Sequence, residues 1–145
     1  MKIVIQRVQQ ASVSVEEEIK ASIGNGLLLL VCFEQGDDDT VINKSVDKIS
    51  KLRIFDDSQG KMNLDIQAVN GEILSVSQFT LSWDGSGGHR PSFEQSMPPQ
   101  EARLKYAIFN RELRQRGMIV KEGQFGSFMK VSLINDGPVT FTLNF

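Results

Sequence analysis

The order of apolar and polar residues predicts a chain rich in β-strands. Residues 2–8 alternate between the two kinds, and the valines at 13 and 15 continue the pattern, which is typical of a half-buried strand. Residues 27–33 are apolar throughout, which predicts a central strand covered on both faces. Residues 72–81 are expected to form another buried strand. Further strands are predicted at 19–23, 54–55, 118–121, 128–134 and 139–144.

Two helices are predicted between these strands. Residues 37–40 are acidic or hydroxylic and begin a segment whose apolar residues recur at helical spacing. A second helix begins at the prolines 98–99, which suit a first turn, and ends at Gly117. Because strands outnumber helices and return to one another locally, we expect one α+β domain over residues 1–145. It has a mixed, mostly antiparallel sheet with the two helices packed on one side.

Length and charge narrow the class of protein. The chain has 145 residues, of which 40% are hydrophobic and 23% charged, as in an ordinary globular domain. Its net charge of −2 is unlike that of a basic nucleic-acid-binding protein, so a polyanion would have to meet a local basic patch. The segment 1–8 is too short for a signal peptide, and its apolar and polar residues alternate instead of forming an apolar run. No apolar run in the chain approaches the ~20 residues of a membrane span. A cytoplasmic protein without membrane contact is therefore expected.

The chain has one cysteine and one histidine, which restricts its chemistry. An intramolecular disulfide is excluded, as is a zinc site built from cysteine and histidine alone. Cys32 lies in the apolar run 27–33 and is expected to be a buried, inert thiol. His89 is the only possible imidazole base. It lies in the glycine-rich loop 82–91. Three roles are open to it: catalytic base of a serine-type esterase, phosphate contact together with Arg90, or an ordinary solvated side chain. No metal or cofactor is predicted.

Two segments carry unusual residues. In residues 75–81, hydroxyls and an amide interrupt a strand that should be buried, so they either line a pocket or bond to neighbouring backbone. Residues 135–138 are predicted to form a hairpin turn between the last two strands. Pro138 removes a hydrogen-bond donor where the next strand begins, and Gly137 lets another group approach closely. This second segment also suits a rigid backbone element presented to a ligand.

Together these segments resemble one family. Residues 77–80 (SQFT) and 135–141 (NDGPVTF) are similar to the paired signatures of the D-aminoacyl-tRNA deacylase family. Residues 1–8, residues 90–93 and the total length are similar as well. The resemblance implies a homodimer with its active sites at the subunit interface. It implies hydrolysis of the ester that joins a D-amino acid, or glycine, to the 3′-terminal adenosine of tRNA, without a cofactor.

The resemblance also assigns roles to residues. The segment that binds the adenosine and aminoacyl ends and carries catalysis is Ser77, Gln78, Phe79 and Thr80. Gly137 and Pro138 would form a cis peptide that enters the partner's pocket, with Arg7 holding it in place. Because two enantiomers carry the same groups, discrimination needs a wall that only one of them strikes. Glycine has no side chain to strike that wall and would be admitted.

The expected mechanism uses backbone groups. Amide N–H groups near Phe79 and Thr80 would stabilise the developing oxyanion, while the ribose 2′-hydroxyl helps to activate water. Thr80 as a covalent nucleophile is the alternative, although no base is visible to activate it. A serine-type esterase that uses His89 and a non-catalytic RNA-binding dimer that kept the fold remain as further alternatives.

Contact with tRNA is assigned to basic residues. The loop before Arg90 differs from the family pattern, because it has no lysine where relatives tend to carry one. In this loop, the residues predicted to contact tRNA are His89 and Arg90. The second helix carries Arg111 and Arg114 on its outer face, which either contacts tRNA or is an ordinary solvated face.

Overall fold

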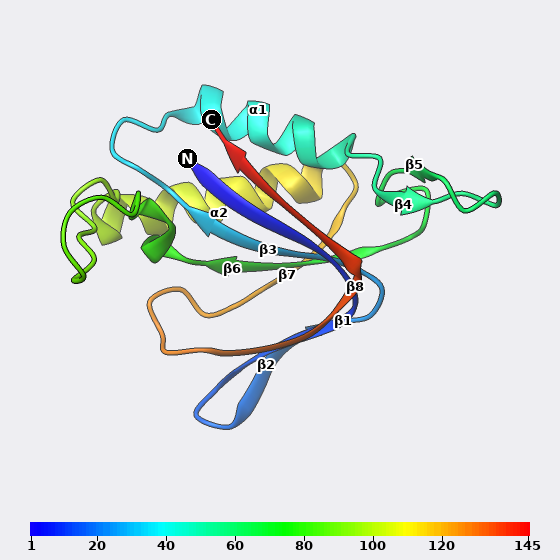
Figure 1. Cartoon of the computed structure of the whole chain (residues 1–145), viewed down its shortest axis with the longest axis horizontal. Helices are drawn as coiled ribbons and strands as arrows, with labels where there is room; N and C mark the ends of the chain where they lie inside the picture. Colours follow the sequence, from blue (N-terminus) through cyan, green and yellow to red (C-terminus); the bar gives the residue numbers. More distant parts are fainter.

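A six-stranded mixed sheet forms the centre of the computed structural model, which describes residues 1–145 (Figure 1). Its strands are β1 (Lys2–Val15), β2 (Glu18–Ile23), β3 (Gly26–Cys32), β6 (Glu72–Ser77), β7 (Ile119–Glu122) and β8 (Lys130–Asn144). The order is β2-β1-β3-β6-β7, and β8 also pairs with β1. β1 is antiparallel to β2, β3 and β8, whereas β6 is parallel to β3 and β7. The predicted mixed, mostly antiparallel sheet is confirmed.

Helices α1 (Asp39–Ser50) and α2 (Pro99–Gln115) both lie on one side of this sheet, as predicted (Figure 1). α1 begins where the side chain of Asp38 accepts a hydrogen bond from the backbone N–H of Val41 at 3.0 Å. The larger hydrophobic core lies between the helices and the sheet. It includes Ile42 and Ile49 from α1 and Phe109 from α2.

The long strands β1 and β8 bend, so that the second half of β1, the first half of β8 and β2 cover the other face of the sheet (Figure 1). A second core fills this side, with Val8, Ala11, Val13, Ile23, Leu28, Leu74 and Val76. β3 is therefore buried on both faces, with Leu27 and Leu29 in the larger core and Leu28 in the smaller one. This arrangement explains its unbroken run of apolar residues.

The predicted hairpin turn at residues 135–138 is wrong, because β8 continues through it and both halves of β8 pair with β1. The register of that pairing shifts on either side of Val8. In the interruption, the side-chain amide of Asn135 donates to Arg7 O at 2.9 Å and to Val139 O at 3.0 Å. Pro138 lies here, where its missing N–H breaks no regular ladder bond.

The predicted strand at 72–81 is too long. β6 ends at Ser77, and Phe79–Ser82 form a 3₁₀ turn, η1. The backbone N–H of Gln78 still donates to Val31 O at 2.8 Å before the chain leaves the sheet. The predicted strand at 54–55 corresponds to β4 (Phe55–Asp56), which pairs with an unpredicted strand, β5 (Met62–Leu64). None of the helices has the length and apolar character needed to cross a membrane.

Candidate functional site

The segment Ser77–Thr80 leaves the carboxyl end of β6 and begins the turn η1. The backbone N–H groups of Phe79 and Thr80 are the first two of this turn, so they have no partner within it. No other acceptor in the protein bonds to either of them. The side-chain amide of Gln78 donates to Thr80 Oγ1 at 2.6 Å. This turn therefore carries two backbone N–H groups without a hydrogen-bond acceptor. The neighbouring Thr80 hydroxyl accepts a hydrogen bond from the Gln78 side chain and has no base beside it.

An apolar cavity of about 520 Å³ opens beside this turn. Ser77 and Phe79 lie on its wall with residues of β3, of the start of α2 and of the loop before β8, among them Cys32, Pro99 and Phe125. Ser77 and Phe79 also border a second, smaller cavity of about 350 Å³. The Phe79 ring is 56% exposed and meets Phe93 edge to face at 5.1 Å. Thr80 is exposed and lines neither cavity.

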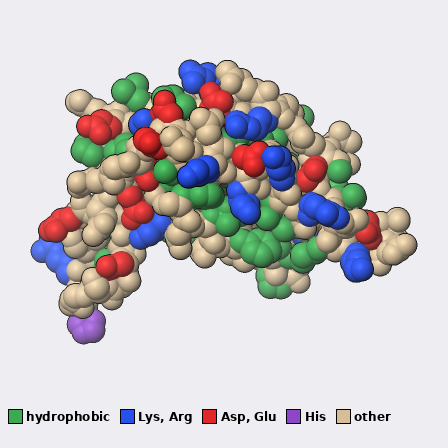
Figure 2. All heavy atoms as spheres, turned by 90° about the horizontal axis from the view of Figure 1, so that it is seen from above, with side chains coloured by type: hydrophobic (Ala, Val, Ile, Leu, Met, Phe, Trp, Pro, Cys, Tyr) green, Lys and Arg blue, Asp and Glu red, His purple; other side chains and the backbone are tan.

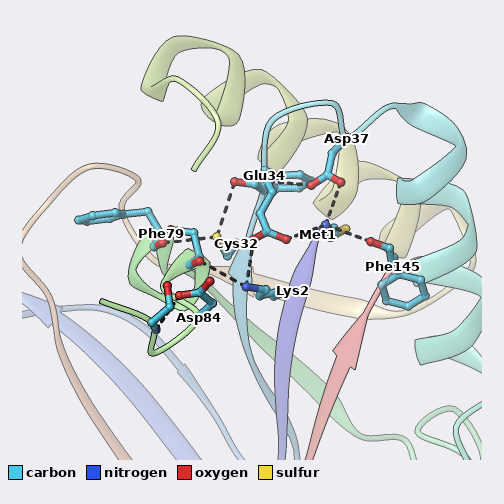
Figure 3. A network of polar contacts seen from close by, with 11 residues as sticks. Met1, Lys2, Cys32, Glu34, Asp37, Phe79, Asp84 and Phe145 are labelled. Carbon is cyan, nitrogen blue, oxygen red and sulfur yellow. Dashed lines mark hydrogen bonds and ion pairs between the residues drawn. The ribbon is translucent and has the colours of Figure 1, made fainter. Parts of the chain in front are cut away.

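Polar contacts with the ends of β1 and β3 hold η1 in place (Figure 3). Lys2 Nζ donates to Ser82 O at 3.3 Å and pairs with Glu34 Oε1 at 3.1 Å. The Cys32 thiol lies 3.5 Å from Phe79 O. Burial, reinforced by the nearby charge of Glu34, raises the pKa of Cys32 to about 11. The thiol is thus protonated at neutral pH and acts as a weak donor, in agreement with the inert cysteine predicted.

Gly137 and Pro138 are exposed and joined by a cis peptide bond. Arg7, itself buried, holds the residue before them: its Nε lies 3.1 Å from Asp136 Oδ2 and 3.3 Å from Asp136 O. Arg7 Nη1 also donates to Ile54 O at 2.7 Å. Gly137 has a φ of +128°, and a Cβ placed on it would stand 2.6 Å from Val139 Cγ2. Only glycine fits this position without a shift of its neighbours.

The two segments lie far apart within one chain. Ser77 pairs with Val31, and Val31 pairs with Ile3 at the start of β1. Gly137 lies beside Arg7, four residues further along β1, and belongs to a strand three positions away from β6. With ~3.3 Å per residue and ~4.8 Å per strand, the separation is on the order of 20 Å. A single chain therefore does not bring the predicted catalytic and chiral segments together.

The remaining predicted residues lie outside both cavities just described. His89 is exposed in the projecting loop 82–91 and makes no hydrogen bond to a hydroxyl or carboxylate, so the triad of a serine-type esterase is not assembled (Figure 2). Arg90 is also exposed in this loop. Arg111 pairs with Glu112 at 3.2 Å, and Arg114 pairs with Glu122 at 2.5 Å. Figure 2 shows basic and acidic side chains intermixed rather than a continuous positive field.

Two parts of the cavity wall were not predicted from the sequence. Phe125 lies between β7 and β8, and the only local signal is an aromatic residue next to Gly126 within a short loop. Cys32 was predicted to be buried but not to line a cavity. Elsewhere in the chain, no three histidine, cysteine, aspartate or glutamate side chains gather so as to hold a metal ion.

Comparisons with known proteins cover the whole chain. The family model for D-Tyr-tRNA(Tyr) deacylase matches residues 4–144. A D-aminoacyl-tRNA deacylase of Lactobacillus acidophilus is 51% identical over 144 residues, which cover 99% of both chains. Another, of an Exiguobacterium species, is 50% identical over 143 residues, which cover 99% of this chain and 97% of its own.

Two solved structures share the fold. The c-Myc DNA unwinding element binding protein superposes with a TM-score of 0.94 at 39% identity, covering 99% of this chain and 98% of its own. A probable eukaryotic D-amino acid tRNA deacylase superposes with a TM-score of 0.85 and covers 98% of this chain and 97% of its own. At 17% identity, that second likeness shows the fold alone.

These full-length matches show the class of protein: it is an enzyme, and its reaction class is hydrolysis. The chain belongs to the D-Tyr-tRNA(Tyr) deacylase family. The resemblance seen in residues 77–80 and 135–141 is thereby confirmed.

Proposed function

We propose that the protein hydrolyses the ester bond of D-aminoacyl-tRNA, and of glycyl-tRNA, and releases the free amino acid and tRNA. The observation that carries this proposal is the pair of free amide N–H groups at Phe79 and Thr80, in a turn whose residue Phe79 lines an apolar cavity. Such a cavity suits the flat, apolar faces of the base of a terminal nucleotide. The amides then lie where the ester carbonyl of that nucleotide would be held.

The chemistry follows from what these donors can stabilise. Attack of water on the ester carbonyl develops negative charge on its oxygen, and two fixed amide donors stabilise that charge. The ribose 2′-hydroxyl beside the ester helps to activate the water. Thr80 Oγ1 receives an N–H from Gln78 and has no base within hydrogen-bond range, which supports a mechanism without a covalent threonine intermediate.

A second copy of the chain would supply the chiral wall. Gly137 and Pro138 are exposed, and Arg7 and Asn135 fix the backbone on either side of them. Because these residues lie on the order of 20 Å from η1 in one chain, a homodimer is the arrangement that lets them meet the reacting ester. A fixed wall of main chain excludes the L-side chain but admits a D-residue or glycine. The enzyme would act in the cytoplasm, on aminoacyl-tRNA.

One assay tests the proposed activity. Purified protein is incubated separately with D-tyrosyl-tRNA, L-tyrosyl-tRNA and glycyl-tRNA, and the remaining charged tRNA is followed over time. We expect the D-form and the glycyl form to be hydrolysed while the L-form persists. Binding without turnover of any of the three would instead indicate a non-catalytic RNA-binding protein. Equal loss of the D- and L-forms would contradict the chiral wall.

The cross-subunit site has its own test. Two variants, one altered at Phe79 and one at Gly137, are purified and then mixed under conditions that allow subunits to exchange. If each site takes η1 from one copy and Gly137 from the other, a mixed dimer contains one intact site. We expect an excess of the Phe79 variant to raise the ratio of D- to L-tyrosyl-tRNA hydrolysis given by the Gly137 variant, because the intact site is selective and the other site carries both changes. An unchanged low ratio in a demonstrated mixed dimer contradicts the arrangement.

A further inference from the structure

Arg103 differs from the other basic residues of α2. Each of the others lies within ion-pair distance of a carboxylate: Lys105 of Asp39, Arg111 of Glu112, Arg114 of Glu122, and Arg116, just after the helix, of Glu112. Arg103 is exposed, and its side chain makes neither an ion pair nor a hydrogen bond to any other residue. Its charge is therefore free to meet a ligand.

The guanidinium of Arg103 lies at the rim of the apolar cavity. Its Cζ stands 5.1 Å from the centre of the Phe125 ring. Its Nη2 lies 3.6 Å from the position that a Cβ on Gly126 would take. Phe125 and Gly126 both line the cavity, as does Ala102, the neighbour of Arg103 in the helix. The Phe125 ring in turn packs against Tyr106, one turn along α2, at 5.7 Å.

The contact with Phe125 leaves the donors of Arg103 available. An aromatic face attracts the guanidinium charge without accepting a conventional N–H···O hydrogen bond, so the N–H groups can still bind an anion. The planar fork then matches two oxygens of a phosphate group. The cavity beneath is apolar, so it offers nothing to neutralise the phosphate that accompanies a bound nucleotide.

We propose that Arg103 binds a backbone phosphate of the single-stranded 3′ end of the tRNA while the terminal nucleoside occupies the cavity. The inference rests on the proposed function, because it takes a tRNA 3′ end to be the ligand. It adds a phosphate-binding residue at the cavity rim, beside Phe125 and Gly126. Arg103 is a binding residue here and takes no part in the chemical step.

The test compares two substrates that share the same ester. D-Tyrosyl-tRNA carries the phosphates, whereas 3′-O-(D-tyrosyl)adenosine has none. We expect Arg103→Gln to raise KM for the tRNA roughly tenfold, with kcat little changed, since one charge-assisted contact is lost. The steepness of log(kcat/KM) against log[salt] should fall by about 0.7, the contribution of one phosphate contact on a single strand. Kinetics with the nucleoside ester should not change.

Two further variants make the comparison specific. Arg103→Lys keeps the charge but loses the planar fork, so we expect an intermediate KM. Arg53→Gln removes another exposed arginine that has no carboxylate partner, at the β4 end of α1, where it donates to Asn63 O at 2.7 Å. That variant should leave KM for both substrates unchanged. Thermal unfolding monitored by circular dichroism verifies that each variant is folded.

The outcomes separate this inference from the proposed function. Equal losses with the tRNA and the nucleoside ester would show that Arg103 shapes the cavity rather than binds phosphate, and unchanged kinetics with both would exclude the contact. If the wild-type protein hydrolyses neither substrate, the proposed function fails. The affinity of uncharged tRNA for the same variants then decides on Arg103: weaker binding for Arg103→Gln alone supports the contact, and equal binding overturns it.

Discussion

Arg7 holds Asp136 at two points, because its Nε lies 3.1 Å from the side-chain Oδ2 and 3.3 Å from the backbone carbonyl oxygen. A second donor of the same side chain, Nη1, reaches Ile54 O, so one buried arginine joins β1, the residue before β4 and the middle of β8. The backbone that leads into Gly137 is thereby tied to the core of the sheet rather than to its own strand alone.

Arg7→Gln should lower the free energy of unfolding by about 1–3 kcal/mol, because it leaves the buried Ile54 carbonyl without its charged donor. It should also reduce the ratio of D- to L-tyrosyl-tRNA turnover. Urea unfolding gives the stability. Lys51→Gln, which breaks an exposed ion pair with Asp47, is the control and should change stability by less than about 1 kcal/mol. Similar values for the two variants would show that Arg7 is no more than a surface charge.

Gly137→Ala should distort the segment that we propose as the chiral wall. Its φ of +128° disfavours any side chain, and the new Cβ would lie 2.6 Å from Val139 Cγ2. We expect a cost of about 1–3 kcal/mol and a lower ratio of D- to L-tyrosyl-tRNA hydrolysis. Gly24→Ala is the matched control, since open space surrounds that glycine and its φ is not positive. An unchanged ratio in folded Gly137→Ala would remove this glycine from chiral selection.

Local patterns in the sequence predicted those elements that local contacts determine. The start of α1 is an example, because Asp38 accepts its bond from Val41, three residues away. The middle of β8 is the opposite case. Its residues have the composition of a hairpin turn, but the Asn135 amide that satisfies this stretch bonds to Arg7 O, 128 residues distant. No pattern within residues 135–138 carries that information.

The sequence predicted the two segments of the candidate site but not the turn and the cavity that they help to form. Residues 77–80 stood out because polar groups interrupt an apolar strand, yet the turn that frees the amides of Phe79 and Thr80 was read as more strand. Phe125 and Arg103 were not singled out. Their contact depends on how the loop after β7 lies against the start of α2, which no periodicity records.

Thr80→Ala should retain substantial deacylation. The hydroxyl accepts one hydrogen bond from Gln78 and faces no base, so its loss is expected to cost about 0.5–1.5 kcal/mol of transition-state stabilisation at most, or roughly 2- to 10-fold in rate. Single-turnover hydrolysis of D-tyrosyl-tRNA measures it, and acid quenching tests for labelled amino acid bound to the protein. Near-complete inactivity of a folded variant, or a trapped acyl-enzyme, would make Thr80 the nucleophile instead.

The Cys32 thiol should make folding stability depend on alkaline pH. Burial raises its pKa from 9.0 to about 11, so the folded protein keeps a proton that the unfolded chain releases. This contribution is complete below pH 9.0 and is lost as pH rises to about 11. Cys32→Ala lacks it, so its free energy of unfolding should fall less steeply over that interval. Urea unfolding of both proteins at several pH values measures the difference. Identical slopes of the free energy of unfolding against pH would show that folding does not raise the pKa of the Cys32 thiol.

The outer face of α2 provides the last prediction. Arg111 and Arg114 are each paired with a glutamate on a partly exposed surface, and such pairs are worth only about 0–1 kcal/mol. Either arginine can therefore leave its partner for a phosphate at little cost. Reversing both charges, as Arg111→Glu with Arg114→Glu, also removes the ion pairs of these two positions with Glu112 and Glu122. We expect weaker tRNA binding and a salt dependence that is flatter by about 1–2 in slope.

The matched control reverses two ion-paired lysines near β2, away from the helices. Lys20 pairs with Glu18 and Lys130 pairs with Glu17, so Lys20→Glu with Lys130→Glu makes the same change in net charge. If binding were governed by overall charge alone, both double variants would weaken it equally. A loss confined to the α2 variant places tRNA on that face, whereas an unchanged salt slope there means that Arg111 and Arg114 belong to an ordinary solvated surface.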